Sequence, residues 1–483
     1  MEKVIRQPSL IQAFIPIVFL ICLLGLNVYF FGDDTLSGSN QIGLILATGV
    51  AGIIAARLGF RWNEIKEGMV NSISSAMPSI LILFLIGSLA GTWMISGVVP
   101  ALIFYGLKIL DPVIFLFAAA IISAIISVST GSSWSTVATI GIALLGIGKA
   151  MGISEGIVAG AIISGAYFGD KMSPLSDTTN LAPAMAGTDI FTHIRYMTHT
   201  TIPSILISLL IFLIIGFTYD FGSSTTDISA VLNAIDSNFN ITPWLFLVPA
   251  FLIFIIIKKV PPLPALLAGT LLGAIFALIF QPDIVKSIAG IGDNMWKASY
   301  VGIMKSMFGK ISIITQNEAI NELLSTKGMA GMLNTIWLII AAMAFGGIME
   351  TSGMLRKITS LLIRKVQSTG SLVASTVGTC IFFNLTASDQ YLAIVVPGRM
   401  FASTYKEKGY KPELLSRTLE DSGTVTSVLI PWNTCGATQS GVLGVSVMAY
   451  APFAFFCLIS PLMTILFAVF NIKIRRIKSE EEE

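Results

Sequence analysis

Apolar runs of about 20 residues, long enough to cross a bilayer as a helix, recur along this chain from one end to the other. Of its 483 residues, 54% are hydrophobic and only 12% are charged, whereas a soluble domain has roughly a quarter charged residues. Inside a bilayer the backbone must satisfy its own hydrogen bonds, which helices do within each segment. The pattern therefore predicts an all-α polytopic membrane protein, with no segment left over for a separate soluble domain.

Charges beside the apolar runs predict the topology, because Lys and Arg gather on the cytoplasmic side of membrane proteins. Spans are expected at residues 11–31, 41–59, 74–96, 195–219, 242–257, 262–281 and 330–353. Basic residues such as Arg57, Arg61 and Lys66 follow the second span, and Arg475 and Arg476 lie near the C-terminus. About ten crossings, a place in the cytoplasmic membrane, and both termini in the cytoplasm are the resulting expectations.

A weak internal repeat relates the two halves of the chain. The sequence GTWMISG at 91–97 matches GIMETSG at 347–353 in both glycines and the serine. At the same offset Thr130, Ser132 and Ser133 fall on Thr386, Ser388 and Asp389, and at a slightly smaller offset Asp170, Ser173 and Ser176 fall on Asp421, Thr424 and Ser427. Since the predicted topology runs these halves in opposite directions, the pattern is typical of an inverted-repeat transporter.

Each half is predicted to contain a short interfacial segment, a re-entrant hairpin with a polar tip, and a broken helix. The hairpin arms are expected to be too short to span the bilayer. The predicted first repeat is 1–221, with its hairpin at 112–148 and its broken helix at 155–187. An external linker at 222–241 follows, then a second repeat at 242–478 with its hairpin at 369–404 and its broken helix at 412–446, and an acidic tail at 479–483.

The stretch GDKMSPLSDTTNLAP, residues 169–183, interrupts a predicted helix with two carboxylates, four hydroxyls, an amide and two prolines. Non-helical backbone survives at membrane depth only where protein buries it or a water-filled cavity meets it. Hard cations take oxygen ligands, so the stretch predicts a cation site, with Na⁺ at Asp177, Asn180 and Ser173. A loop between two short helices is the alternative explanation.

The predicted cation-binding set takes polar residues from both breaks and both hairpin tips. Its members are Thr130, Ser132, Asp170, Ser173, Ser176, Asp177, Thr178, Thr179, Asn180, Thr386, Ser388, Asp389, Asp421, Thr424, Asn433 and Thr434. A charge at bilayer depth costs about 3 kcal/mol or more on insertion scales, so intramembrane carboxylates are functional candidates by default. Asp170, Asp177, Asp389 and Asp421 are accordingly the predicted proton carriers.

For the remaining polar side chains the sequence predicts ion pairs or locations and no direct part in ion binding. Lys171 is expected to pair with the adjacent Asp170, and Arg417 with Asp421 one turn later. The two histidines, His193 and His199, are expected to be interfacial. The four cysteines are expected to be reduced and buried, because they lie in or beside apolar stretches without metal-binding spacing: Cys22, Cys380, Cys435 and Cys457.

The stretch GAYFGDKMSPLSDTTNLAPAMAGTDIFTHIRYM, residues 165–197, resembles the NhaC family of Na⁺/H⁺ antiporters within the ion-transporter superfamily, and the resemblance extends over nearly the whole chain. It implies two inverted repeats with re-entrant hairpins, and cation exchange driven by an ion gradient. The family also includes carriers that exchange Na⁺-lactate for H⁺-malate and other organic solutes.

The sequence thus predicts a secondary active transporter that exchanges Na⁺ for H⁺ by alternating access. The alternative is a Na⁺-coupled organic-anion exchanger. Its anion would need positive groups at membrane depth, and the candidates are Lys171, Arg399 and the half-helix N-termini near Ser132 and Ser388. Walker A, GxSxG and HExxH sequences are lacking, so neither a pump nor an enzyme is expected. Na⁺, H⁺ and the bilayer are the expected partners, with no cofactor and no nucleic acid, and a homodimer is left open.

Overall fold

The structure, a computed structural model, describes residues 6–31, 38–219, 228–291, 294–315, 318–363 and 368–477. Some predicted segments, and some charged residues beside the predicted spans, lie outside these ranges. They are the acidic tail at 479–483, the first residues of the predicted linker, and the charged residues Lys3, Asp33, Asp34, Asp220, Arg364, Lys365 and Lys478.

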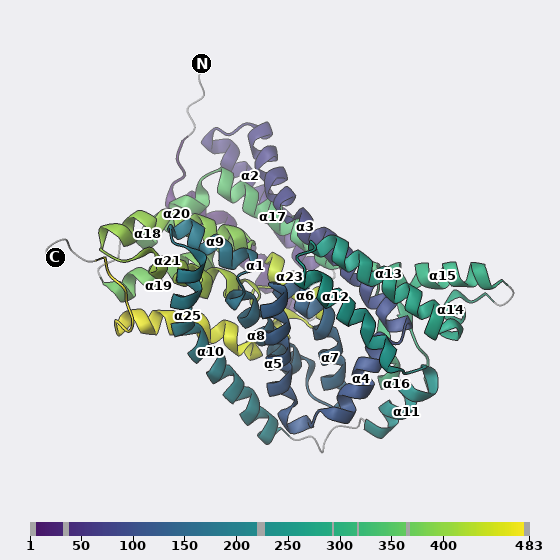
Figure 1. Cartoon of the computed structure of the whole chain (residues 1–483). Coiled ribbons are helices and arrows are strands. Elements are labelled where there is room, and N and C mark those ends of the chain that lie inside the picture. Colours follow the sequence, from purple (N-terminus) through teal and green to yellow (C-terminus); the bar gives the residue numbers. More distant parts are fainter. Residues whose placement is uncertain are drawn as a thin grey trace.

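Helices make up nearly all of the described chain, as predicted for an all-α polytopic membrane protein (Figure 1). In the described ranges nine helices are long and apolar enough to cross a membrane, or up to eleven if each of two bent pairs is one span. The nine are α1 (Leu10–Phe31), α2 (Ser39–Leu58), α3 (Trp62–Ile95), α5 (Pro112–Thr130), the arm Ser133–Ala150, α10 (Ile190–Thr218), α13 (Pro262–Phe280), Met329–Thr351 with α17 (Leu333–Thr351) inside it, and α19 (Thr369–Thr386).

Between α3 and α10 the first half adds a short helix, a hairpin and a broken helix, in the predicted order. After α4 (Val98–Ile109), α5 turns back into an arm made of α6 (Ser133–Thr136), the π-helical η2 (Val137–Gly141) and α7 (Ile142–Ala150). The broken helix is α8 (Glu155–Met172) followed by α9 (Asp177–Ala186). Residues 173–176 form the break and contain Pro174, whereas Pro183 lies inside α9 and does not interrupt it.

The second half repeats this order after η4 (Pro243–Phe246), α12 (Leu247–Ile257), α13 and α17. The short helix is α18 (Met354–Ile363), and the hairpin is α19 with α20 (Gln390–Glu407). The broken helix comprises α21 (Pro412–Leu419), the π-helical η6 (Glu420–Thr424), α22 (Val425–Ser427) and α23 (Thr434–Leu443). The half ends with α24 (Val447–Tyr450), η7 (Ala451–Phe453) and α25 (Phe455–Val469). This agreement in order supports the predicted repeat, whose inverted symmetry stays a prediction.

The hairpin arms are longer than predicted. The two arms of the first hairpin have 19 and 18 residues, and both arms of the second have 18. At 1.5 Å per residue such arms extend about 27 Å. The expectation that the arms are too short to span the bilayer is therefore wrong. The prediction ended each arm where its apolar residues give way to polar ones. The helices continue through these polar residues up to the turn, where side chains cap them.

Both hairpin tips use one residue with positive φ followed by an N-cap. Gly131 (φ 70°) precedes Ser132, whose side chain accepts a hydrogen bond from Ser135 N. Ser388 (φ 60°) precedes Asp389, whose side chain accepts one from Leu392 N. By capping role Asp389 therefore matches Ser132. The repeat alignment, which placed Asp389 on Ser133, slips by one residue at this turn.

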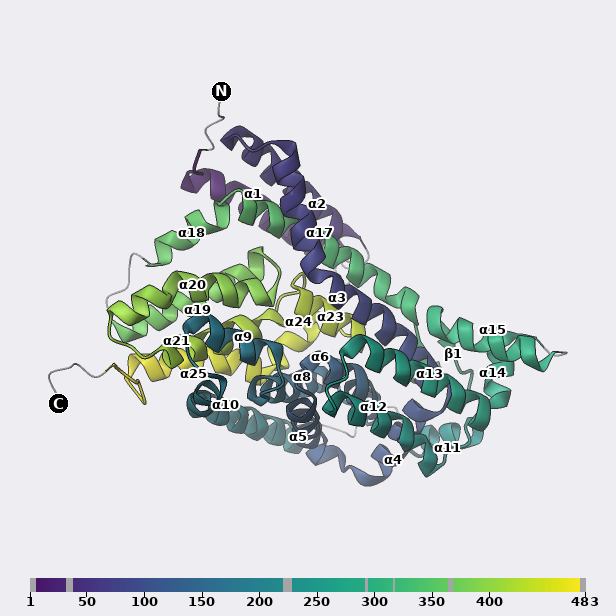
Figure 2. The ribbon, with the colours of Figure 1, turned by 45° about the horizontal axis from the view of Figure 1, so that its top comes forward.

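The helices form two groups that lie side by side (Figures 1 and 2). In one group α3 packs against both α17 and α13, and α2 packs on α17. In the other, α5 packs along α8, and α10 packs against both α5 and α25. Gly165 and Gly169 allow α5 and α8 to approach closely, since an added Cβ would come within 2.0 Å of Ala120 O and 2.4 Å of Ala124 O. This close packing holds the first break beside the first hairpin.

Short elements connect the spans on the side predicted to be external. The linker predicted as a polar loop contains the amphipathic helix α11 (Ile228–Asn238), which buries Val231 and Ile235. After α13 come α14 (Pro282–Ala289), α15 (Met295–Phe308), α16 (Glu318–Leu323) and η5 (Met329–Met332). Strand β1 (Ile311–Ser312) pairs antiparallel with β2 (Ser325–Thr326), in the register Ile311 with Thr326.

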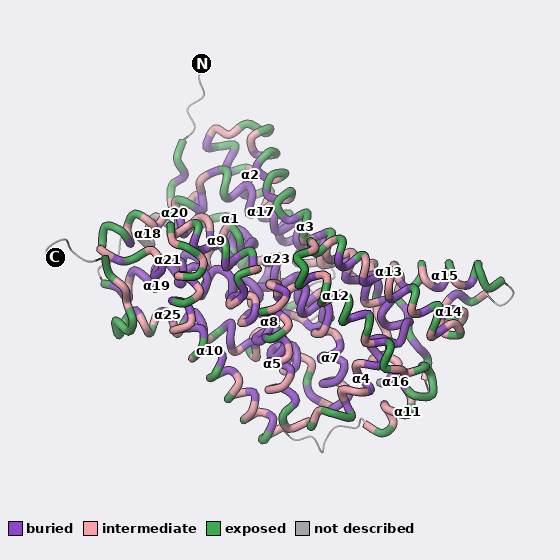
Figure 3. Tube along the Cα trace, in the orientation of Figure 1, coloured by how far each residue is buried: buried purple, intermediate pink, exposed green. Residues whose placement is uncertain are grey.

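Burial is concentrated where the two groups of helices meet, around α8 and α23 (Figure 3). The outer helices expose apolar stripes; on α13 they are formed by Leu267, Leu271, Ile275 and Ile279. In a polytopic membrane protein such stripes face lipid. All four cysteines are free as expected, but Cys22 is exposed on α1, so its predicted burial is wrong.

Candidate functional site

The first break and the first hairpin tip meet at Asp170, near the end of α8. Asp170 Oδ2 accepts hydrogen bonds from Ser133 N at 3.0 Å and Ser133 Oγ at 2.6 Å. Ser133 is the first residue of the returning arm, where backbone N–H groups have no helical acceptor and favour a negative partner. The hairpin tip therefore holds the Asp170 carboxylate in a fixed position at the break.

An open pocket of about 300 Å³ lies beside this contact. The first half contributes Ser132, Asp170 and Asp177, and the second hairpin contributes Gln390 and Tyr391. Prolines of the α12–α13 turn, Pro261, Pro262 and Pro264, form one wall. The pocket thus collects polar groups from both halves of the chain around two carboxylates.

A second pocket of about 480 Å³ adjoins the first and shares Ser132 and Asp177 with it. Thr130, Asn180 and Lys259 also line it. Asp177 is exposed to this space and accepts a long hydrogen bond, 3.4 Å, from Tyr391 Oη. Asp177 is the first residue of α9, so its carboxylate lies where the helix begins, beside the pocket.

Other polar residues of the first break are bonded to neighbouring backbone. Ser173 Oγ donates to Val128 O at 2.8 Å, which ties the break to α5. Thr179 Oγ1 donates to Lys171 O at 3.0 Å, and Asn180 Nδ2 donates to Ser176 O at 2.7 Å. These bonds hold the break in shape, while Asp170 and Asp177 both line the pocket.

The corresponding residues of the second half form a closed cluster. Asn433 Nδ2 donates to Asn384 Oδ1 at 3.1 Å, and Asn384 Nδ2 donates to Gly423 O at 2.8 Å. Thr434 N donates to Ser388 O at 2.9 Å, which joins the second break to the second tip. Asp389 lies beside this cluster, buried at the start of α20. None of these residues lines the pocket described above.

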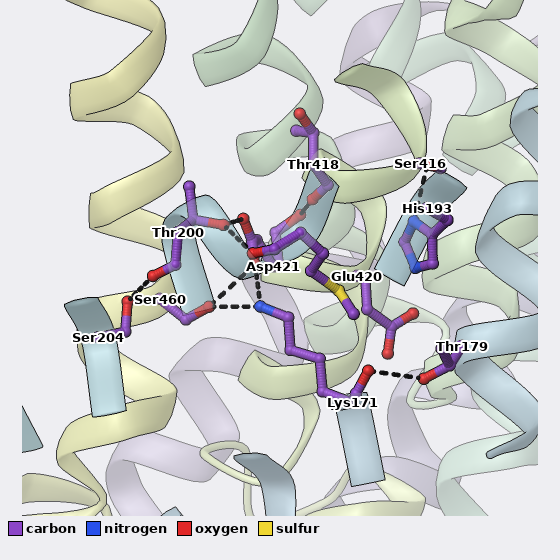
Figure 4. Close-up of polar contacts among 12 residues, drawn as sticks. Lys171, Thr179, His193, Thr200, Ser204, Ser416, Thr418, Glu420, Asp421 and Ser460 are labelled. Atoms are coloured by element: carbon purple, nitrogen blue, oxygen red, sulfur yellow. Dashed lines mark hydrogen bonds and ion pairs between the residues drawn. The ribbon is translucent and has the colours of Figure 1, made fainter. Parts of the chain in front are cut away.

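A fully buried ion pair connects the two broken helices (Figure 4). Lys171, at the end of α8, donates from Nζ to Asp421 Oδ1 in η6. Ser460 of α25 accepts from Lys171 Nζ at 3.0 Å, and Thr200 of α10 donates to Asp421 Oδ2 at 2.8 Å. Four elements from the two halves therefore surround one pair of charges.

Two predicted pairings are wrong. Lys171 does not pair with the adjacent Asp170, because successive helix residues point about 100° apart, and its side chain runs into the other half instead. Arg417 does not pair with Asp421; its guanidinium lies 4.6 Å from the Tyr196 ring centre and has no hydrogen-bond partner among the described residues. His193, expected to be interfacial, is fully buried and contacts Ser416 Oγ through Nδ1 at 2.8 Å.

Glu420 is a buried carboxylate that the sequence analysis missed. Thr178 Oγ1 donates to Glu420 Oε1 at 3.0 Å, and Thr178 also lines the pocket. Glu420 Oε2 is buried without a hydrogen-bond partner among the described residues. Its position directly before Asp421 in a predicted membrane segment was a signal that could have identified it.

The structure thus divides the predicted cation-binding residues between four places. The pocket and its neighbour are lined by Thr130, Ser132, Asp170, Ser176, Asp177, Thr178 and Asn180. The closed cluster and its surroundings hold Thr386, Ser388, Asp389, Thr424, Asn433 and Thr434. Asp421 belongs to the ion pair, while Ser173 and Thr179 brace the first break. Within the described ranges no three His, Cys, Asp or Glu side chains form a metal-binding group.

Known proteins resemble this chain over almost its whole length. A family model described as the Na⁺/H⁺ antiporter family matches residues 165–472. The Na⁺/H⁺ antiporter NhaC of Alkalihalophilus pseudofirmus is 39% identical, over 91% of this chain and 92% of its own. The malate-2H⁺/Na⁺-lactate antiporter of Bacillus subtilis is 36% identical, over 93% and 92%. Neisseria gonorrhoeae MtrF, of a class of antimetabolite efflux pumps, aligns over 95% of both chains at 15% identity with a TM-score of 0.37.

Proposed function

The chain belongs to the Na⁺/H⁺ antiporter family and exchanges Na⁺ for H⁺ across a membrane, and we propose that both ions use the pocket lined by Asp170 and Asp177. The observation that carries this proposal is the convergence of two carboxylates, a hairpin tip and a helix break on one open pocket. The carboxylate and hydroxyl oxygens gathered at this end of the cavity suit a hard cation.

Competition for the same oxygen atoms couples the two ions. A carboxylate that binds Na⁺ must release its proton, and a carboxylate that takes up a proton loses its attraction for Na⁺. Asp177 is exposed to the pocket and is the proposed primary ligand, with Asn180 close by on α9. Asp170, which Ser133 orients, is the proposed second carboxylate.

Alternating access requires that the ion site open to each side in turn. The pocket adjoins the α12–α13 turn, where Lys258 and Lys259 predict the cytoplasmic side. We place the chain in the cytoplasmic membrane with both termini in the cytoplasm, and the described state then opens inward. The predicted inverted repeats would generate the outward-open state by exchanging the roles of the two halves.

Replacing Asp177 tests the site. The Asp177→Asn variant keeps the side chain's size but removes the charge, so we expect Na⁺-driven proton movement in proteoliposomes to fall by an order of magnitude or more. The matched control is Asp236→Asn on α11, an exposed carboxylate that lines neither pocket. Equal exchange by both variants would contradict the proposal.

A second cargo class deserves a direct test because the two adjoining pockets are far larger than a bare cation. Lys259 supplies a positive charge there, and Tyr391 and Trp134 supply aromatic surface. The two cations predicted to bind an organic anion, Lys171 and Arg399, are not placed to do so. Lys171 is paired with Asp421, and Arg399 does not line either pocket. Offering malate and lactate with Na⁺ to the same proteoliposomes decides between the two: exchange that requires an organic anion would replace the inorganic assignment.

A further inference from the structure

A groove of about 480 Å³ opens on the outer surface between α2 and α3, away from the ion pocket. The helices are joined by a tight turn at 59–61 and then diverge, and Ile348 of α17 forms the floor between them. On α2 the lining residues recur at helical spacing through Gly49, Gly52 and Ile53, and on α3 through Trp62 and Met69. One face of each helix therefore shapes the groove.

The absence of side chains at two glycines keeps the groove open. A Cβ added at Gly49 would have nothing within 4 Å, and one at Gly52 would meet only Ile348 Cδ1 at 3.8 Å. Thr48, the polar residue of the lining, turns its hydroxyl to Leu44 O at 2.7 Å. The surface that remains is apolar, so it suits a hydrocarbon chain and offers nothing to a polar ligand.

Basic residues surround the end of the groove at the α2–α3 turn. Arg57 follows Ile53 by one turn of α2, and Lys66 follows Trp62 by one turn of α3, so both flank the groove. Arg61 lies between them in the turn. Two acids lie nearby: Glu64 caps the start of α3 by accepting from Arg61 N at 2.6 Å, and Glu67 lies on the opposite side of α3 from Ile65. The three cations form no ion pair within the described residues.

We propose that this groove binds one anionic phospholipid, with an acyl chain along Gly49 and Gly52 and the phosphate at Arg57, Arg61 and Lys66. Charge complementarity selects this occupant, because an apolar groove that ends in three cations matches a hydrocarbon chain joined to an anion. Trp62, which is 66% exposed, lies at the boundary between the two parts, where indole rings favour the headgroup level. The inference is independent of the ion site and goes beyond the exchange activity.

Native mass spectrometry of the full chain measures the binding directly. Phosphatidylglycerol and phosphatidylcholine with identical acyl chains are offered in turn to the protein released from detergent. Wild-type protein is expected to retain one phosphatidylglycerol more firmly than phosphatidylcholine. The Gly49→Leu variant fills the groove and is expected to lose this adduct, whereas Gly25→Leu, on an open face of α1 with nothing within 4 Å, is expected to keep it.

A second set of variants tests the headgroup end. Each of Arg57→Gln, Arg61→Gln and Lys66→Gln is expected to weaken phosphatidylglycerol binding about fivefold, since a cation near an anionic lipid contributes roughly that factor. The charge-matched control replaces three other exposed cations, Arg195, Lys406 and Lys408, with Gln. Glycerol phosphate without acyl chains is expected to leave the adduct in place, which distinguishes a lipid from a free phosphate.

Three results would overturn the proposal, provided that thermal unfolding shows each variant to be folded. The first is an adduct that survives Gly49→Leu. The second is equal retention of the two lipids, or equal loss from the charge variants and their control. The third is a dimer that disappears in Gly49→Leu while lipid retention is unchanged, because the groove would then receive a second copy of the chain.

Discussion

Asp170 and Lys171 are adjacent on α8, yet their side chains serve different parts of the molecule. Asp170 meets the first hairpin tip through Ser133 and lines the pocket, while Lys171 enters the second half and pairs with Asp421. A shift at the end of α8 therefore moves a pocket carboxylate and a contact between the halves together. Such a shared element is a physical route by which ion binding can bias the arrangement of the two halves.

Removing Lys171 should destabilise the fold. The Lys171→Met variant leaves the Asp421 carboxylate fully buried without its counter-charge, and breaking a buried pair in this way costs about 3–5 kcal/mol. Thermal unfolding in detergent should show a clear loss of stability. The double variant Lys171→Met/Asp421→Asn should recover much of it, since no uncompensated charge remains.

The matched control is the partly exposed pair Lys149–Glu155, with Nζ and Oε1 2.6 Å apart. Exposed pairs contribute about 0–1 kcal/mol, so Lys149→Met should unfold nearly as the wild type does. If the two single variants lost equal stability, burial would not be the cause of the Lys171 effect.

Ser133 provides a milder test of the pocket. The Ser133→Ala variant removes the 2.6 Å hydroxyl bond to Asp170 but keeps the backbone bond, so the carboxylate is held less firmly. Because a hydrogen bond to a charged group contributes about 1.5–3 kcal/mol, we expect a measurable change in the apparent KM for Na⁺ while exchange persists. The control is Ser129→Ala, which removes a hydroxyl that donates to Ile125 O within α5, and it should exchange like the wild type.

At this scale the sequence identified the pocket carboxylates but not the ion pair. Asp170 and Asp177 were predicted because polar residues interrupt an apolar run, a local signal. The partner of Lys171 is 250 positions away, and spacing along one helix cannot reveal a contact that packing between helices creates. Glu420 was missed because the adjacent Asp421 was predicted to be the functional carboxylate of that segment.

Among the elements, the turn at Gly131 packs tightly against the first break. A Cβ there would lie 2.5 Å from Leu175 Cβ and 2.8 Å from the Leu175 backbone carbon, and φ is positive. The first hairpin tip thus packs directly against the first break, with no room for a side chain. The shape of the ion site depends on this contact as well as on its oxygen atoms.

The Gly131→Ala variant should therefore impair exchange. Positive φ alone costs an L-residue about 1–2 kcal/mol, and the clash with Leu175 adds a displacement of the break. Since small misplacements of reacting groups cause large losses of rate, we expect the Na⁺-driven exchange rate to fall on the order of tenfold or more. Gly187→Ala separates the causes, because Gly187 also has positive φ (84°) but an added Cβ meets nothing within 4 Å. Equal activity of the two variants would show that the clash is unimportant.

The elements themselves were largely predictable. Helical spans followed from the length of apolar runs, and both breaks were found near 173–176 and 428–433, where polar residues and prolines interrupt them. The hairpin arms were underestimated because polar caps extend a helix beyond its apolar part. The one-residue shift in the alignment of the two tips could not be predicted from the sequence, because it depends on which residue of each tip has positive φ: a glycine in the first and a serine in the second.

Across the whole molecule the two halves share an order of elements but differ in openness. The first break lines an open pocket with Asp170 and Asp177, whereas the second break is closed by hydrogen bonds from Asn433 to Asn384 and from Thr434 to Ser388. An ion entering from the pocket side therefore meets the first half's carboxylates. One accessible site for two ions predicts competition, whereas separate sites would predict independent binding.

Competition has a measurable pH dependence. If Na⁺ and H⁺ share the pocket carboxylates, lowering the pH on the Na⁺-binding side should raise the apparent KM for Na⁺, approaching about tenfold per pH unit for each competing proton. The maximal rate at saturating Na⁺ should change much less, because enough Na⁺ displaces the proton. Initial rates of ²²Na⁺ uptake into proteoliposomes, measured over a grid of pH and Na⁺ concentration, test both statements. A KM that is independent of pH, with a maximal rate that falls as the pH is lowered, would instead require the proton to bind outside the pocket, and Glu420 behind Thr178 would then be the first residue to replace.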